Sequence, residues 1–210
     1  MIAGRDGFDG MRRSVPSTRR NEAVTLNTFA LFVHVSGAVG IFAGMGAFVF
    51  GVGALRRAQR VEQVRLLTAL ILASSNLVVG SIVVLGIAGF YMAITVWGIQ
   101  ATWIVVATVS FLLLIPLGLL IFGPRTQVIA KEAREAPDGP LPEPLAMRSR
   151  DPALSAGLSV YVGVLLGIVF LMTNKPPLDV SILAMVVATA LGLVSGLLLW
   201  WAGRFQLRVT

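Results

Sequence analysis

The sequence predicts an all-α membrane protein, a bundle of five transmembrane helices. Of its 210 residues, 56% are hydrophobic and only 13% are charged, whereas a soluble chain carries about 25% charged residues. Five apolar runs each approach or exceed the roughly 20 residues that a helix needs to cross a bilayer. Small residues recur three and four positions apart in several runs, which is typical of membrane helices that pack closely.

We expect residues 1–24 to form a disordered basic tail, because this stretch is rich in glycine and arginine and has no apolar period. A start of translation at Met11 is the alternative. Residues 25–210 then form the transmembrane helical domain. The expected spans cover about residues 26–55, 66–94, 102–122, 153–173 and 180–202, with a cytoplasmic loop over residues 123–152.

The first span carries no charged residue and holds the only histidine of the chain, His34. Its small residues fall three and four positions apart, at Gly37, Gly40, Gly44, Ala47, Gly51 and Ala54. Such a row lets another helix approach closely. We favour a helix of the same chain as the partner; a second copy, giving a homodimer, or another membrane protein is the alternative.

The second span contains a polar cluster within the membrane, Ser74, Ser75 and Asn76. Polar side chains in hydrocarbon often form hydrogen bonds with groups on neighbouring helices. We therefore expect interhelical hydrogen bonds here, and the lining of a substrate path is the alternative.

The third span contains Pro116, which removes a backbone hydrogen bond and should kink the helix. The loop after it opens with a stretch that suits a short surface helix, residues 125–135, and its proline-rich stretch over residues 137–144 disfavours regular structure. In the fourth span Gly163 and Gly167 form a GxxxG pair. The fifth span repeats small residues every four positions: Ala184, Ala188, Gly192 and Gly196.

The orientation follows from the positive-inside rule. The turn at residues 56–65, the long loop and the C-terminus share one side and carry eleven Lys and Arg; the tail and the other turns carry six. This predicts an N-terminus outside and a C-terminus in the cytoplasm, although the five arginines of the tail favour the opposite orientation. The net charge of +7 is best explained by contact with anionic lipid headgroups rather than nucleic acid.

His34 is the candidate cofactor ligand of the expected spans, and three roles remain open for it. It can hydrogen-bond to a neighbouring helix, at Asn76 or Ser75, it can bind haem b or a copper ion, or it can handle protons. The chain has no cysteine, and Met45 lies about 16 Å from His34 along a helix axis, too far to share a metal ion. We therefore predict no cofactor, with haem b or copper as the alternative.

The stretch Phe32–Gly40, with the glycines after it, resembles the first helix of small bacterial integral membrane proteins of unknown function. Residues 122–125 and 172–176 fit the same group. The opening with a histidine followed by glycines is also similar to copper-resistance-D-type membrane domains. The first resemblance implies a multi-pass protein of the bacterial inner membrane; the second implies a metal-binding role for His34 alone.

Together these observations predict a non-catalytic accessory or structural helix bundle, embedded in lipid and without nucleic-acid partners. Two alternatives remain: a haem- or copper-binding redox component that uses His34, and a permease for an uncharged solute.

Overall fold

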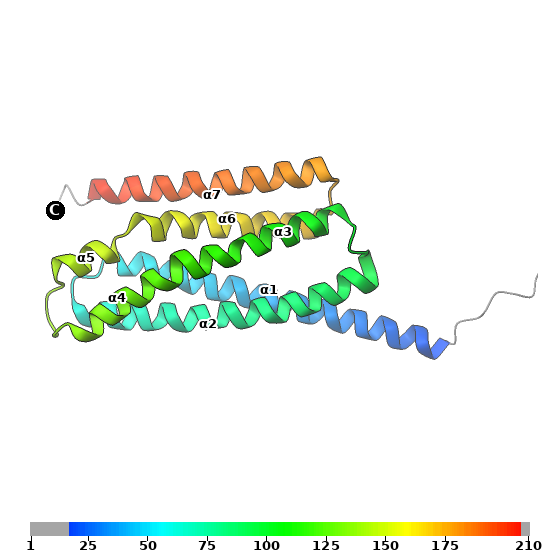
Figure 1. Ribbon diagram of the computed structural model, residues 1–210, viewed down its shortest axis with the longest axis horizontal. Helices are drawn as coiled ribbons and strands as arrows, with labels where there is room; N and C mark the ends of the chain where they lie inside the picture. The colour runs from blue at the N-terminus through cyan, green and yellow to red at the C-terminus, as the bar shows by residue number, and fades with distance from the viewer. Residues whose placement is uncertain (1–16, 207–210) are drawn as a thin grey trace, which may run out of the picture.

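The computed structural model describes residues 17–206, and within them it contains helices and no β-strand (Figure 1). Five segments are long and apolar enough to cross a membrane, which confirms the predicted fold class. The α-helices are α1 (Ser17–Leu55), α2 (Val61–Met92), α3 (Thr102–Leu117), α4 (Gly123–Glu135), α5 (Glu143–Ser149), α6 (Pro152–Asn174) and α7 (Leu178–Gln206). Two π-helical turns, η1 (Ala93–Trp97) and η2 (Gly118–Phe122), follow α2 and α3.

Several helices are longer than the apolar runs that predicted them. The first begins at Ser17, so residues 17–24, which we expected in a disordered tail, are its first turns. The rest of that tail, Met11 included, lies outside the described residues. The second begins at Val61 rather than at residue 66, because the polar first turn of a helix leaves no trace in an apolar pattern.

The expected loop over residues 123–152 is mostly helical. The third span runs through η2 into α4, so that residues 102–135 form one continuous helical segment. The π-helical turn begins two residues after Pro116, which lacks the N–H group that a regular α-helix needs. The proline-rich stretch also ends in a helix: α5 begins at Glu143 with Pro144 in its first turn, a position where a missing N–H costs nothing.

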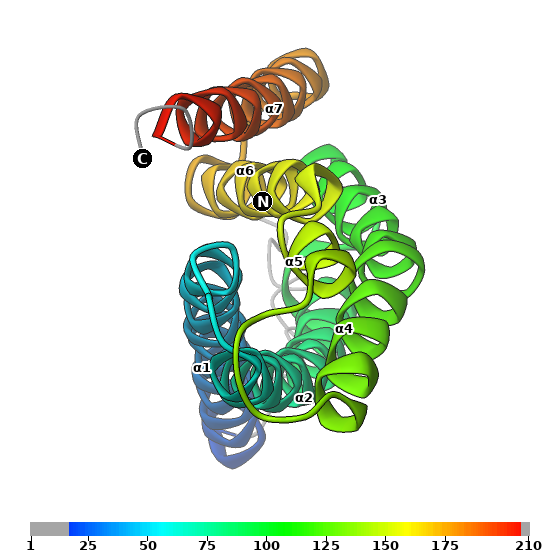
Figure 2. The same cartoon turned by 90° about the vertical axis from the view of Figure 1, so that its left-hand side faces the viewer.

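The helices pack as two close pairs (Figure 2). Helix α1 packs mainly on α2, and α7 mainly on α6; α3 and α4 join the pairs by packing on α6 and α2 respectively. An aromatic cluster lies between the pairs, where the Phe122 ring is 5.6 Å from that of Phe48 and 6.0 Å from that of Tyr161. Much of the remaining apolar surface faces outward, as expected of a protein whose solvent is lipid.

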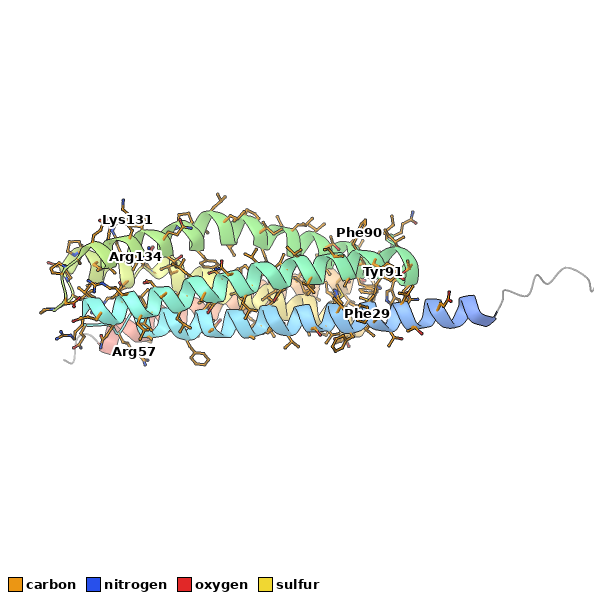
Figure 3. The ribbon with its side chains drawn as sticks, turned by 90° about the horizontal axis from the view of Figure 1, so that it is seen from below. Phe29, Arg57, Phe90, Tyr91, Lys131 and Arg134 are labelled. Atoms are coloured by element: carbon orange, nitrogen blue, oxygen red, sulfur yellow. The ribbon has the colours of Figure 1, made fainter. Side chains whose placement is uncertain are left out.

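The two ends of the bundle differ in chemistry (Figure 3). Arg57, Lys131 and Arg134 lie at one end, which we call the basic end; it also contains α5 and the turn between α1 and α2. Phe90 and Tyr91 lie at the opposite end, which we call the aromatic end and which also contains η1 and the turn between α6 and α7. Aromatic and basic side chains at the two limits of an apolar bundle mark its membrane–water interfaces.

Candidate functional site

The row of small residues on α1 faces α2 from Gly37 to Gly51, whereas Ala54 is exposed. A methyl group at Gly37 would lie 2.9 Å from both the backbone nitrogen and the Cβ of Leu85. One at Gly44 would lie 2.6 Å from a methyl of Val78. The same face continues to Gly51, opposite Ile71, whereas Ala47 is half-buried. The absence of side chains along this row therefore sets how closely α1 and α2 approach.

His34 lies in the same α1–α2 interface, half-buried. Its Nδ1 is 3.1 Å from the carbonyl oxygen of Leu85, so the expected partners Asn76 and Ser75 are wrong. The ring occupies the space that a side chain at position 89 would fill, since a methyl group at Gly89 would be 2.9 Å from its Cε1. A glycine on α2 thus makes the place for the imidazole, and one backbone carbonyl orients it.

The polar cluster of α2 does not link helices as we expected. The hydroxyl groups of Ser74 and Ser75 donate to carbonyl oxygens of their own helix, at Leu70 and Ile71, over 2.8 and 2.9 Å. A serine inside a helix can satisfy its hydroxyl group in this way without a partner on another helix. Asn76 is exposed on the outside of α2.

The α6–α7 pair is tighter still. A methyl group at Gly163 would lie 2.5 Å from the carbonyl oxygen of Ala188, and one at Gly192 would lie 2.6 Å from that of Ser159. Gly167 instead faces side-chain atoms, those of Met185 and Ala188. At Gly163 and Gly192 backbone meets backbone, so no side-chain rotation could make room for an added methyl group there.

At the aromatic end, Lys175 joins two turns of the bundle. Its Nζ lies 3.7 Å from the centre of the Trp97 ring, and the Trp97 and Trp103 rings are 5.7 Å apart. Lys175 has a φ of 50°, a left-handed conformation that costs a non-glycine residue about 1–2 kcal/mol. The contact of its ammonium group with the indole ring offsets part of that cost.

Most charges of the basic end are paired. Arg65 donates to the carbonyl oxygen of Ala133 over 2.6 Å, to that of Ala136 and to the Asp138 carboxylate, so it caps the end of α4. The other ion pairs of the described residues are Arg60–Glu62, Arg125–Asp151, Lys131–Glu135 and Arg148–Glu132. The Glu62 carboxylate, 2.9 Å from the Arg60 guanidinium, raises the pKa of Arg60.

A groove of about 2080 Å³ runs between α1, α6 and α7. Its floor is α6, over residues 152–170. One wall is residues 49–59, at the end of α1 and in the turn after it, and the other wall is residues 180–195 of α7. Figure 2 shows α1 and α7 standing apart on either side of α6. Ligand pockets for small molecules measure about 300–1,000 Å³, so this groove is large enough for a longer, amphipathic molecule.

Three arginines lie at the basic end of the groove: Arg56, Arg57 and Arg150. Among the described residues none of the three forms an ion pair. Arg56 instead donates to the hydroxyl of Ser155 over 3.0 Å, which ties the end of α1 to α6. The groove thus combines apolar helix faces with unneutralised positive charge, and no sequence motif marks it.

Within the part of the chain that the structure describes, no group of three or more His, Cys, Asp or Glu side chains could hold a metal ion. His34 stands alone as a possible ligand. The five long apolar helices and the open groove define a polytopic helical membrane protein.

Residues 28–176 match the model of a family described as "Predicted integral membrane protein (DUF2269)", and the chain belongs to this family, whose function is unknown. This confirms the resemblance to integral membrane proteins of unknown function, and it does not bear on the copper-resistance-D resemblance. The matched segment includes most of α1 and ends before α7. No curated protein and no solved structure was found to match the sequence.

Proposed function

We propose that this protein is a non-catalytic helix bundle of the bacterial inner membrane, with an accessory or structural role. The observation that carries the proposal is the environment of His34. Its Nδ1 meets the Leu85 carbonyl and its ring fills the space beside Gly89, so the imidazole serves the packing of α1 on α2. A histidine used in this way needs no cofactor to explain its presence in the membrane.

The test is absorbance spectroscopy and metal analysis of the full chain, purified in mild detergent from cells supplied with haem precursor and copper. We expect colourless protein without stoichiometric metal. A Soret band or one copper per chain that is lost in His34→Gln would overturn the proposal and establish the redox alternative. His34→Gln in colourless protein should lower the free energy of unfolding by about 0.5–1.5 kcal/mol, as expected for one lost hydrogen bond.

The permease alternative receives no support from the polar cluster of α2. Asn76 is exposed, and Ser74 and Ser75 bond to their own helix. None of these three residues lines the groove.

We further propose that the basic end faces the cytoplasm, as the count of positive residues favours. The chain has no cysteine, so single cysteines can report the orientation. Gln100 lies in the turn between η1 and α3, at the aromatic end, and Met147 lies on α5 and is 65% exposed. Each is replaced by cysteine in a separate variant. A membrane-impermeant maleimide should label Gln100→Cys in intact cells and Met147→Cys only in permeabilised cells; the reverse pattern would refute the orientation.

A further inference from the structure

We propose that the groove between α1, α6 and α7 is a binding site for one anionic phospholipid, with its phosphate at Arg57 and Arg150 and its acyl chains along the apolar walls. This goes beyond the proposed accessory role, because it assigns a ligand class to a site that the family match does not describe.

The charges at the groove favour an anionic head. The carboxylates of the basic end neutralise Arg60, Arg65, Arg125, Lys131 and Arg148. Among the described residues Arg56, Arg57, Arg134 and Arg150 are left without carboxylate partners. Three of these four, Arg56, Arg57 and Arg150, line the groove. An arginine binds phosphate through two parallel N–H groups. Positive charge gathered beside an apolar channel is the complement of a phospholipid, not of an uncharged solute.

The three-sided part of the groove is shorter than one leaflet. The wall on α1 extends from Val49 to the arginines at its end, and the seven residue steps from Val49 to Arg56 rise about 10 Å. One leaflet contributes about 15 Å of hydrocarbon. Beyond Val49 only α6 and α7 line the groove. The three-sided part of the groove therefore accommodates acyl chains that hang from a head at the basic end.

Phe50 and Gly53 show that this wall is open. Phe50 lines the groove with its side chain 79% exposed. A methyl group at Gly53 would meet no atom within 4 Å. A large apolar side chain at Gly53 can therefore fill the groove without disturbing the packing of α1.

A second copy of the chain suits the groove less well. Copies of a membrane protein insert with the same orientation, so a partner would bring its own basic end to the same depth. Like charges would then meet at Arg57 and Arg150, whereas a phosphate would neutralise them.

Lipid retention by the full chain in detergent, measured by native mass spectrometry, tests the proposal. The probes are palmitoyl-oleoyl phosphatidylglycerol and phosphatidylcholine, which share acyl chains and differ in charge. We expect the protein to retain one phosphatidylglycerol at concentrations where it loses phosphatidylcholine. Arg57→Gln with Arg150→Gln should weaken phosphatidylglycerol retention by on the order of 30-fold, about fivefold for each arginine.

Two matched controls make the test specific. Lys131→Gln with Arg134→Gln removes the same charge at the same end, from residues that do not line the groove, and should leave retention unchanged. Gly53→Phe should abolish retention, whereas Gly80→Phe, at an open position of α2 outside the groove, should not. Circular dichroism checks that each variant is folded. The proposal would be overturned if the Arg57/Arg150 and Lys131/Arg134 double variants lost phosphatidylglycerol equally. Equal retention of both lipids by the unmodified protein, or a dimer that Gly53→Phe disrupts, would also overturn it.

Discussion

Replacing Gly37 by alanine tests how the α1–α2 interface is held. The added methyl group would lie 2.9 Å from the Leu85 nitrogen and 3.0 Å from its Cα. Because these are backbone atoms, the two helices must move apart. Overpacking of this kind costs about 1–3 kcal/mol, and the better helix propensity of alanine returns up to about 1 kcal/mol. We expect Gly37→Ala to lower the free energy of unfolding by about 1–2 kcal/mol.

The control is a second glycine-to-alanine substitution on α1, at Gly46. A methyl group at Gly46 would meet no atom within 4 Å, so Gly46→Ala should be neutral or stabilising by up to about 1 kcal/mol. The measurement is reversible unfolding of the full chain in mixed micelles of dodecyl maltoside and sodium dodecyl sulfate, followed by circular dichroism.

A pair of double variants sharpens the result. At Gly40 the added methyl group would meet the hydroxyl of Ser81, a side chain. Ser81→Ala should therefore rescue most of the loss in Gly40→Ala, whereas Leu85→Ala should not rescue Gly37→Ala. Equal stabilities of Gly37→Ala and Gly46→Ala, or full rescue by Leu85→Ala, would refute the argument that the backbone of α2 rests on Gly37.

Three further changes probe other contacts. Gly163→Ala should loosen α7 from α6, seen as faster hydrogen exchange in α7 with α1 unchanged; unchanged exchange in α7 would contradict the backbone contact with Ala188. Lys175→Ala should destabilise the protein by about 1 kcal/mol, because the contact with Trp97 is lost; Lys175→Gly relieves the left-handed backbone and should be milder in the same unfolding assay. Arg65→Ala should cost about 2–3 kcal/mol, since it strips the end of α4 of charged hydrogen bonds. Arg65→Lys should recover only part of this loss, and full recovery by lysine would argue against the forked cap.

The arrangement of charges was only partly visible in the sequence. Counting arginines predicts a basic end, but ion pairs such as Arg65–Asp138 join residues far apart in the chain. Which arginines remain unpaired at the groove is decided by how α1 and α6 approach. The polar cluster shows the same limit, because hydroxyl groups of Ser74 and Ser75 that could have bridged helices bond within one.

Apolar length determined most of the fold. The runs of hydrophobic residues fix five membrane spans, since a bilayer accepts only helices whose backbone groups are satisfied internally. The runs did not show where helices extend beyond the hydrocarbon, so the helical start at Ser17 and the continuation of the third span into α4 were missed.

The sequence by itself determined that this is a five-span membrane protein with rows of small residues at which helices can meet. Only the tertiary structure decided the partners: Leu85 and Gly89 for His34, Leu85 for Gly37, and Ala188 for Gly163. It also decided that α1 and α7 stand apart over α6 and leave a groove. The physical reason is that an apolar helix meets lipid and other helices with nearly equal energy, so its pairing depends on close contacts between particular backbones rather than on hydrophobicity.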